Sequence, residues 1–239
     1  MRWDTFEHIF SKHAGNAFGG VVEAAPEMSN HHGGVFIILI PPPGAFRHLP
    51  ASHGIEWFAG NGYLASYDFY GKEQWHLDIQ QEYGEFAFGW TFSTSPVLHE
   101  GKVYLQVLQR DTAVDGRGFT DKMNESYLLG LDASTGKELW QVDRPSTAQV
   151  ESREAFSTPV VVTHEGRSEL LVVGGDFLTG HDLDTGKELW RWGTWNKDHK
   201  EKFWRLVPSP VYGDGVILAC APKKQPVYAV AAGAEGRVA

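Results

Sequence analysis

Short runs of β-branched and aromatic residues, separated by glycine-containing turns, follow one another along the chain from about residue 55 onward. Two consecutive stretches each contain four such runs, at 95–98, 102–108, 127–132 and 139–143, then at 159–163, 169–173, 177–182 and 189–193. Runs of this length between turn residues are typical of antiparallel strands. The pattern therefore predicts an all-β chain built from four-stranded units.

A second pattern repeats in step with the strands. An Asp, a Gly-Lys-Glu turn and a Trp recur in Ser66–Trp75, Gly130–Trp140 and His181–Trp190. A Ser/Thr-Pro-Val marker recurs in the same order, with its proline at 96, 159 and 210. A four-stranded unit of roughly 40–50 residues that recurs in series indicates a β-propeller rather than a solenoid.

The Asp-x-x-Thr-Gly-Lys turn has a mechanical explanation. We expect its Asp to accept hydrogen bonds from backbone N–H groups of the turn, and its Gly to supply a positive φ. The Trp that follows is large enough to cover the flank of a neighbouring blade. We interpret the following residues as a structural repeat motif: Asp68, Gly71, Trp75, Asp132, Thr135, Gly136, Trp140, Asp182, Thr185, Gly186 and Trp190.

This motif resembles the tryptophan-docking repeat of quinoprotein-like (PQQ-repeat) β-propellers, which reads Ala-x-Asp-x-x-Thr-Gly-x-x-x-Trp. Gly130 and Gly180 stand at the Ala position, and the first copy is one residue shorter, with Tyr70 directly before Gly71. The resemblance covers residues 56–232. It implies a partial β-propeller of about three and a half four-stranded antiparallel blades.

The repeats suggest a division of the chain. Full blades are expected at 93–143 and 157–194, and partial blades at 55–79 and 208–232, all within a propeller region 55–239. Residues 1–54 form an atypical N-terminal segment, expected to be partly disordered, with no copy of either marker. Because so few strands cannot close a propeller ring, we expect either a fragment of a longer protein or self-association that closes the propeller.

Strand order assigns a functional end to the blades. The first and third turns of each blade are short and share one end, whereas the long segments 80–94, 109–125, 144–157 and 194–208 share the other. Long loops on a rigid scaffold are where binding usually resides, and Trp and Arg are enriched in binding hot spots. The candidate binding face for a protein or small-molecule ligand comprises Trp90, Arg110, Arg117, Arg153, Trp195, His199, Trp204 and Arg205. An alternative is that Trp90 and Trp204 only pack the end of the central channel.

Composition excludes several classes of function. The formal net charge of −9 offers no basic face, so we expect no nucleic-acid partner. The single cysteine, Cys220, excludes an internal disulfide. No apolar run is long enough to span a membrane, and the N-terminus as written lacks the apolar core of a signal peptide.

The resemblance also raises an enzymatic alternative. Quinoprotein dehydrogenases hold PQQ between a Trp and an adjacent cysteine pair, with calcium and a catalytic Asp. The chain has no adjacent cysteines and no recognisable calcium loop, so we expect neither PQQ nor calcium. The adjacent His31 and His32 point in opposite directions on an extended segment, which disfavours a metal site.

A non-enzymatic scaffold is therefore the favoured function, with no catalytic residue assigned. The rival is a fragment of a PQQ-dependent alcohol or sugar dehydrogenase, and a truncated product without independent function is a third possibility. The resemblance further implies a larger exported bacterial protein, placed in the periplasm or another extracytoplasmic compartment.

Overall fold

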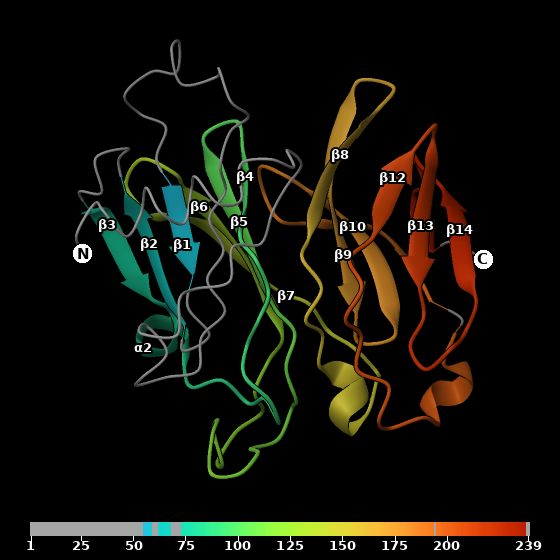
Figure 1. Cartoon of the computed structure of the whole chain (residues 1–239), viewed down its shortest axis with the longest axis horizontal. Coiled ribbons are helices and arrows are strands. Elements are labelled where there is room, and N and C mark those ends of the chain that lie inside the picture. Colours follow the sequence, from blue (N-terminus) through green and yellow to red (C-terminus); the bar gives the residue numbers. More distant parts are fainter. Residues whose placement is uncertain (1–54, 59–61, 68–72, 194, 238–239) are drawn as a thin grey trace, which may run out of the picture.

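The computed structural model describes residues 55–58, 62–67, 73–193 and 195–237 (Figure 1). The predictions for Asp68, Gly71, the His31–His32 pair and the whole segment 1–54 lie outside the described residues.

The described chain forms four sheets of antiparallel strands, which we number as blades 1 to 4. Blade 1 contains β1 (Ile55–Phe58), β2 (Tyr63–Tyr67) and β3 (Glu73–Asp78). Blade 2 contains β4 (Val97–His99), β5 (Lys102–Val107), β6 (Tyr127–Asp132) and β7 (Glu138–Asp143). Blade 3 contains β8 (Val160–His164), β9 (Arg167–Gly174), β10 (Phe177–Asp182) and β11 (Glu188–Trp192), and blade 4 contains β12 (Val211–Gly213), β13 (Val216–Cys220) and β14 (Val227–Ala231).

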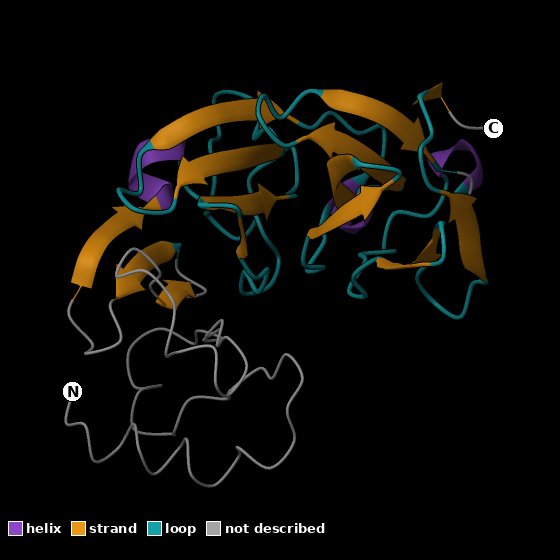
Figure 2. Cartoon of the chain, turned by 90° about the horizontal axis from the view of Figure 1, so that it is seen from above, coloured by secondary structure: helices purple, strands orange, loops and turns teal. Residues whose placement is uncertain are grey.

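The blades follow one another along an open arc (Figure 2). Within each blade, successive strands pair as neighbours, so that every blade is an antiparallel meander. Among the described residues, three short helices lie in the connections, namely α2 (Ile79–Tyr83) and the 3₁₀ helices η3 (Val150–Arg153) and η4 (Lys197–His199). This arrangement confirms the predicted all-β, partial propeller.

Blade 3 departs from the expected four strands. A fifth, short strand, β15 (Gly236–Arg237), pairs in parallel with β11 at Trp190 and Arg191. The sequence prediction assigned no strand after β14, because it found no Gly-Lys-Trp turn there. The outer strand β11 leaves unpaired backbone groups at the edge of its sheet, and β15 satisfies some of them.

The two repeat turns within the described residues have the hydrogen bonds that their sequence predicts. Asp132 Oδ1 accepts from the backbone N–H of Ser134 (3.0 Å) and of Thr135 (2.9 Å). Asp182 Oδ1 accepts in the same way from the backbone N–H of Asp184 (3.1 Å). Hydrogen bonds from the Ser134 and Thr135 side chains lower the pKa of Asp132.

Two of the repeat tryptophans join neighbouring blades. Trp75 of blade 1 donates its indole N–H to the carbonyl of Ala133 in blade 2 (2.8 Å). Trp140 of blade 2 donates to the carbonyl of Leu183 in blade 3 (3.1 Å). Its ring lies so close to Gly186, where φ is +71°, that a Cβ there would be 2.5 Å from it. The turn glycine therefore provides both the backbone conformation and the space for the indole.

The interior lies between the blades. One cluster of buried apolar residues joins blades 1 and 2, and a second joins blades 2, 3 and 4. Strands β5 and β9 are almost entirely buried because a neighbouring blade covers each of their faces. Such packing holds the ends of the blades, and the loops that leave them, in fixed relative positions.

Candidate functional site

The long connections gather at one end of the blades, the lower end in Figure 1, where α2, η3 and η4 also lie. They are the blade-to-blade connectors that leave β3, β7 and β11, together with the long loop between β5 and β6. This placement is the one predicted from strand order. We call this end the loop face.

Backbone hydrogen bonds hold the connectors side by side. The N–H of Arg110 donates to Ala87 O (3.1 Å), and the N–H of Ala155 donates to Leu108 O (3.2 Å). Leu206 then pairs in parallel with Ala155, and its carbonyl accepts from the N–H of Phe156 (2.8 Å). Residues far apart in the sequence thus form one continuous belt across blades 1, 2 and 3.

A chain of charged groups lies along this belt. The fully buried carboxylate of Glu154 accepts from Arg110 Nε and from the backbone N–H of Gly89 (3.0 Å). Arg110 also faces Glu151 at 3.7 Å, and Glu151 pairs with Arg205 at 2.9 Å. Each carboxylate therefore holds a guanidinium in place, and burial makes these contacts stronger than they would be in water.

Arg205, the last of these charged groups, supports an exposed aromatic ring. The guanidinium carbon of Arg205 lies 4.9 Å from the centroid of the Trp90 ring, and the Trp90 side chain is 58% exposed. This cation–π contact orients an indole that would otherwise move freely. We define the Trp90–Arg205 patch as Trp90, Arg110, Glu151, Glu154 and Arg205.

An apolar rim adjoins the patch. Phe203 and Val207, each 59% exposed, lie on the same segment as Arg205. Sequence reasoning missed both residues, although each stands two positions from Arg205, with the buried Leu206 between Arg205 and Val207. It also missed Glu151 and Glu154, for which the sequence carries no signal, because their role depends on the belt that places them beside arginines.

The remaining predicted residues are not part of the patch. Arg153 is buried and donates to the carbonyls of Ser146 (3.0 Å) and Ala148 (3.3 Å), which shape its own loop. Arg117 is exposed on the separate loop between β5 and β6, 4.0 Å from Asp115.

Trp195 and Trp204 contribute to packing. Trp195 is buried, with its ring centroid 5.5 Å from that of Trp192. Trp204 is half-buried against the core, and its backbone N–H donates to Ser152 Oγ (2.9 Å). Neither indole is presented to solvent as the Trp90 indole is.

His199 ties two connectors together. Its Nδ1 lies 2.9 Å from Asp176 Oδ2, and its Nε2 lies 2.6 Å from the hydroxyl of Thr147. Asn196 donates to the same Asp176 oxygen at 2.7 Å. Burial raises the pKa of Asp176, while the bond from His199 opposes that rise. The group joins the connector after β7 to the connector after β11 and to the β9–β10 hairpin.

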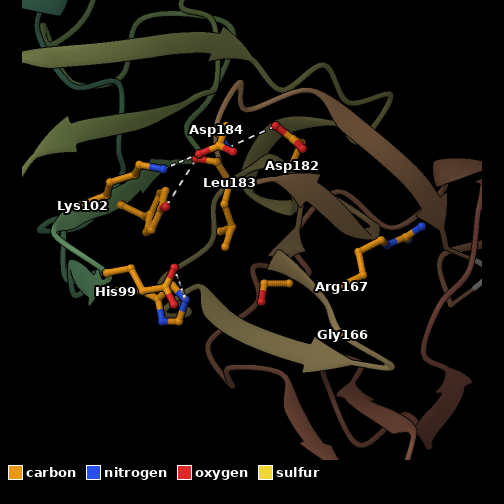
Figure 3. Close-up of a pocket in the computed structure, with 10 residues that line it drawn as sticks. His99, Lys102, Gly166, Arg167, Asp182, Leu183 and Asp184 are labelled. Carbon is orange, nitrogen blue, oxygen red and sulfur yellow. Dashed lines mark hydrogen bonds and ion pairs between the residues drawn. The ribbon is translucent and has the colours of Figure 1, made fainter.

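The opposite end of the blades has a pocket of about 300 Å³ between blades 2 and 3 (Figure 3). Its charged groups are satisfied within the fold. Lys102 pairs with Asp184, and Arg167 points away from the pocket toward Glu235 (3.3 Å). The hydroxyl of Tyr104 donates to Leu183 O (3.3 Å). Both cations of the lining are therefore occupied by carboxylates of the chain itself.

Within the part of the chain that the structure describes, no group of three or more His, Cys, Asp and Glu residues is placed to hold a metal ion. None of the described helices is long and apolar enough to cross a membrane.

The four meander sheets and the Trp-docking turns define the class as a PQQ-repeat β-propeller. Residues 41–238 match the family model PQQ_2, described as outer membrane protein assembly factor BamB, and the chain belongs to this family. A search of curated proteins finds no match.

Solved structures to which the chain is similar include BamB from Moraxella catarrhalis, which is 17% identical, with a TM-score of 0.46 over 71% of this chain and 44% of that one. Another is the quinohemoprotein alcohol dehydrogenase ADHIIG from Pseudomonas putida HK5, at 16% identity and a TM-score of 0.45, over 74% of this chain and 31% of that one. A third is the quinohemoprotein alcohol dehydrogenase from Comamonas testosteroni, at 16% identity and 0.42, over 70% and 31%. The chain thus spans less than half of the length of each of these proteins.

Proposed function

We propose that the chain is a non-enzymatic binding module, and that its loop face binds a protein through the Trp90–Arg205 patch. The observation that carries this proposal is the exposed Trp90 ring held by Arg205. Arg205 is itself held by an ion pair with Glu151, which also faces Arg110. Trp and Arg dominate binding hot spots because a rigid, amphipathic side chain loses little entropy when it is covered.

The surroundings of the patch favour a protein over a small molecule. Phe203 and Val207 add two exposed apolar side chains to the segment that carries Arg205. Small ligands are usually bound in concave sites that cover most of their surface, whereas proteins bind to flatter faces with an aromatic anchor. A small-molecule ligand of the same face remains the alternative.

The charges of the patch fit recognition rather than catalysis. Glu151 pairs with both Arg110 and Arg205 near the Trp90 indole. The charges of these groups therefore largely neutralise one another. We accordingly propose that binding needs neither PQQ nor calcium. The rival function, a fragment of a PQQ-dependent dehydrogenase, requires that the chain bind both.

The test begins with peptides selected from a random library on the immobilised full-length chain. For a selected peptide, Trp90→Ala and Arg205→Ala should each weaken binding by about 2 kcal/mol, or roughly thirtyfold in Kd. Arg117→Ala is the matched control, because Arg117 is an exposed arginine at the same end but outside the patch.

Two results would count against the proposal. Peptide affinities that are unchanged in Trp90→Ala and Arg205→Ala would place binding elsewhere on the molecule. Micromolar binding of PQQ in the presence of calcium, measured by equilibrium dialysis, would favour the dehydrogenase reading instead.

We also propose that the parent protein works outside the cytoplasm, in the periplasm. The support is the family description, which refers to the outer membrane. Fractionation of the native bacterium with an antibody against the chain tests this directly, and recovery with cytoplasmic markers would refute it.

A further inference from the structure

Lysine side chains gather at the blade 4 end of the loop face. Five of the chain's eleven lysines lie there, three in the connector after β11 and two in the turn between β13 and β14. All five are exposed. We call Lys197, Lys200, Lys202, Lys223 and Lys224 the lysine corner. The formal net charge of the whole chain is −9, so this local excess of positive charge runs against the overall composition.

Aromatic packing brings the two lysine-bearing segments together. The ring centroid of Trp195 in the connector lies 6.5 Å from that of Tyr228 in β14, and the Trp192 centroid lies 5.1 Å from the same ring. Lys197 follows Trp195 closely in the chain, and Lys224 closely precedes Tyr228. Figure 1 shows η4 and the turn between β13 and β14 at the lower end of blade 4. The five lysines therefore share one corner of the molecule.

Few carboxylates of the chain neutralise the lysine corner. Lys200 pairs with Asp198 at 3.3 Å. The other four lysines of the corner form no ion pair with any residue that the structure describes. In the Trp90–Arg205 patch, by contrast, Glu151 pairs with Arg110 and with Arg205. The lysine corner therefore keeps a positive potential that the patch does not have.

The turn that carries Lys223 and Lys224 has a strained backbone. Both residues have a positive φ, +55° and +66°, and the N–H of Gln225 donates to Pro222 O (3.2 Å). A turn with positive φ at both central positions usually contains Asn and Gly, because a Cβ is disfavoured in this conformation. Strain of this kind is concentrated at functional sites. Two lysines at these positions therefore indicate a requirement for their charge rather than for their conformation.

The lysine corner continues into the Trp90–Arg205 patch. The backbone N–H of Ser152 in η3 donates to Lys202 O (3.1 Å). Ser152 directly follows Glu151, which pairs with Arg205 at 2.9 Å. The connector that carries three of the lysines thus runs beside the helix that holds Arg205. A protein segment that covers the Trp90 ring can reach the lysine corner along this connector.

We propose that the lysine corner binds an acidic segment of the protein partner of the loop face. This inference rests on the function proposed for the Trp90–Arg205 patch, and it adds the chemistry of the partner, namely Asp and Glu residues beside an apolar anchor. The lysine ammonium is a compact charge on a flexible stem, so it can follow carboxylates whose positions vary. Because these ion pairs are exposed, we expect them to act mainly on the association rate and on its salt dependence.

The test compares two synthetic peptide libraries that share the same apolar positions and differ only in carrying either Asp and Glu or Asn and Gln. Each library is passed over the immobilised full-length chain, and bound peptides are identified by mass spectrometry. We expect the acidic library to supply the bound peptides. For the tightest acidic peptide, K197E/K202E and K223E/K224E should each lower the association rate constant at least about tenfold at low salt. The loss should shrink as salt increases, as surface plasmon resonance can measure.

K137E/K187E is the matched control. Lys137 and Lys187 are exposed lysines in the repeat turns at the opposite end of the blades. The control changes the net charge by the same amount as each lysine-corner variant, and it should leave the association rate constant within about twofold of the wild type. Circular dichroism checks that all three variants are folded.

Trp90→Ala separates this inference from the function on which it rests. If Trp90→Ala weakens binding of the acidic peptide while both lysine-corner variants bind as the wild type does, the patch is a binding site and the role of the lysine corner is refuted. If the lysine-corner variants lose binding and Trp90→Ala does not, the lysine corner binds acidic peptides by itself and the proposal for the patch fails.

Two further results would overturn the inference. One is equal binding of the acidic library and the amide library. The other is binding of phosphatidylglycerol vesicles to the wild-type chain but not to the lysine-corner variants, in competition with the acidic peptide. That result would identify an anionic membrane surface as the occupant.

Discussion

Two junctions between blades differ in how the tryptophan of the repeat motif is hydrogen-bonded. At the junction between blades 2 and 3, Trp140 donates across the gap to Leu183 O in the next repeat turn (3.1 Å). At the junction between blades 3 and 4, Trp190 donates to Glu169 within its own blade (2.7 Å). The segment after β14 has Ala231 and Ala234 where the turn would place its Asp and Thr.

The difference shows that docking of the tryptophan depends on the repeat turn of the next blade. A tryptophan can dock across a junction only if the next blade has the turn that presents a carbonyl to it. Where that turn is missing, the buried indole N–H still needs an acceptor, because an unsatisfied buried donor costs about 1–3 kcal/mol. Glu169 supplies the acceptor, and Arg167 lies 3.7 Å from the same carboxylate.

The largest expected effect comes from the docked tryptophan. Trp140→Ala removes a buried ring and its hydrogen bond, and should lower the free energy of unfolding by about 3–5 kcal/mol. Trp90→Ala, the exposed counterpart, should change it by less than about 0.5 kcal/mol. Urea denaturation followed by both fluorescence and circular dichroism measures this, since coincident transitions are needed for a free energy. Equal losses in the two variants would refute the docking role.

Acidification should destabilise the chain through His181 of blade 3, a residue that has no ionisable counterpart in blade 2. Burial lowers the pKa of His181 to about 4, whereas an unfolded histidine titrates near 6.5. Between these values the unfolded chain binds more protons, so stability is complete above pH 6.5 and falls as the pH drops toward 4. At pH 5 the loss should be about 2 kcal/mol.

Blade 2 supplies the control for this effect, because Leu131 of β6 stands at the position that His181 has in β10 of blade 3. His181→Leu should remove this part of the acid sensitivity when urea midpoints are compared at pH 7.5 and pH 5. An unchanged difference between the two pH values would assign the sensitivity to other groups.

The close approach of Trp140 to Gly186 predicts a smaller effect. Gly186→Ala places a Cβ 2.5 Å from the ring, while Gly166→Ala meets no atom within 4 Å. Both glycines have a positive φ, +71° and +79°, so the conformational cost is shared. Gly186→Ala should therefore be less stable than Gly166→Ala by about 1–2 kcal/mol in urea denaturation. Equal stability would mean that the indole moves aside freely.

The smallest effect concerns the in-blade acceptor. Glu169→Gln keeps the size of the side chain but removes the charge that accepts from Trp190, which should cost about 1 kcal/mol. Tyr104→Phe removes the equivalent cross-blade bond to Leu183 O and should cost about half as much, because that bond is long at 3.3 Å. Thermal unfolding of both variants ranks them, and the reverse order would contradict this account.

Local features of the fold were readable from the sequence because short-range chemistry determines them. In the two repeat turns that the structure describes, Asp132 and Asp182 make the predicted bonds and Gly136 and Gly186 have the predicted positive φ. The strands lie where β-branched runs stand between turns. The end of the blades that carries the long loops also followed from strand order alone. The fifth strand of blade 3 did not, because β15 pairs with β11 through backbone groups that leave no side-chain pattern.

The candidate site divides in the same way. Trp90 and Arg205 were predicted from residue type and loop length, yet Trp195 is equally a loop tryptophan and is buried. Glu151 and Glu154 became part of the patch only through the belt that sets Arg110 and Arg205 beside them. The sequence by itself determined the repeat, the turns and the class of fold, since these depend on neighbours within a few residues. Only the tertiary structure decided which indole is exposed and which charges are paired, because burial and Coulomb energy depend on distances between segments that the chain brings together last.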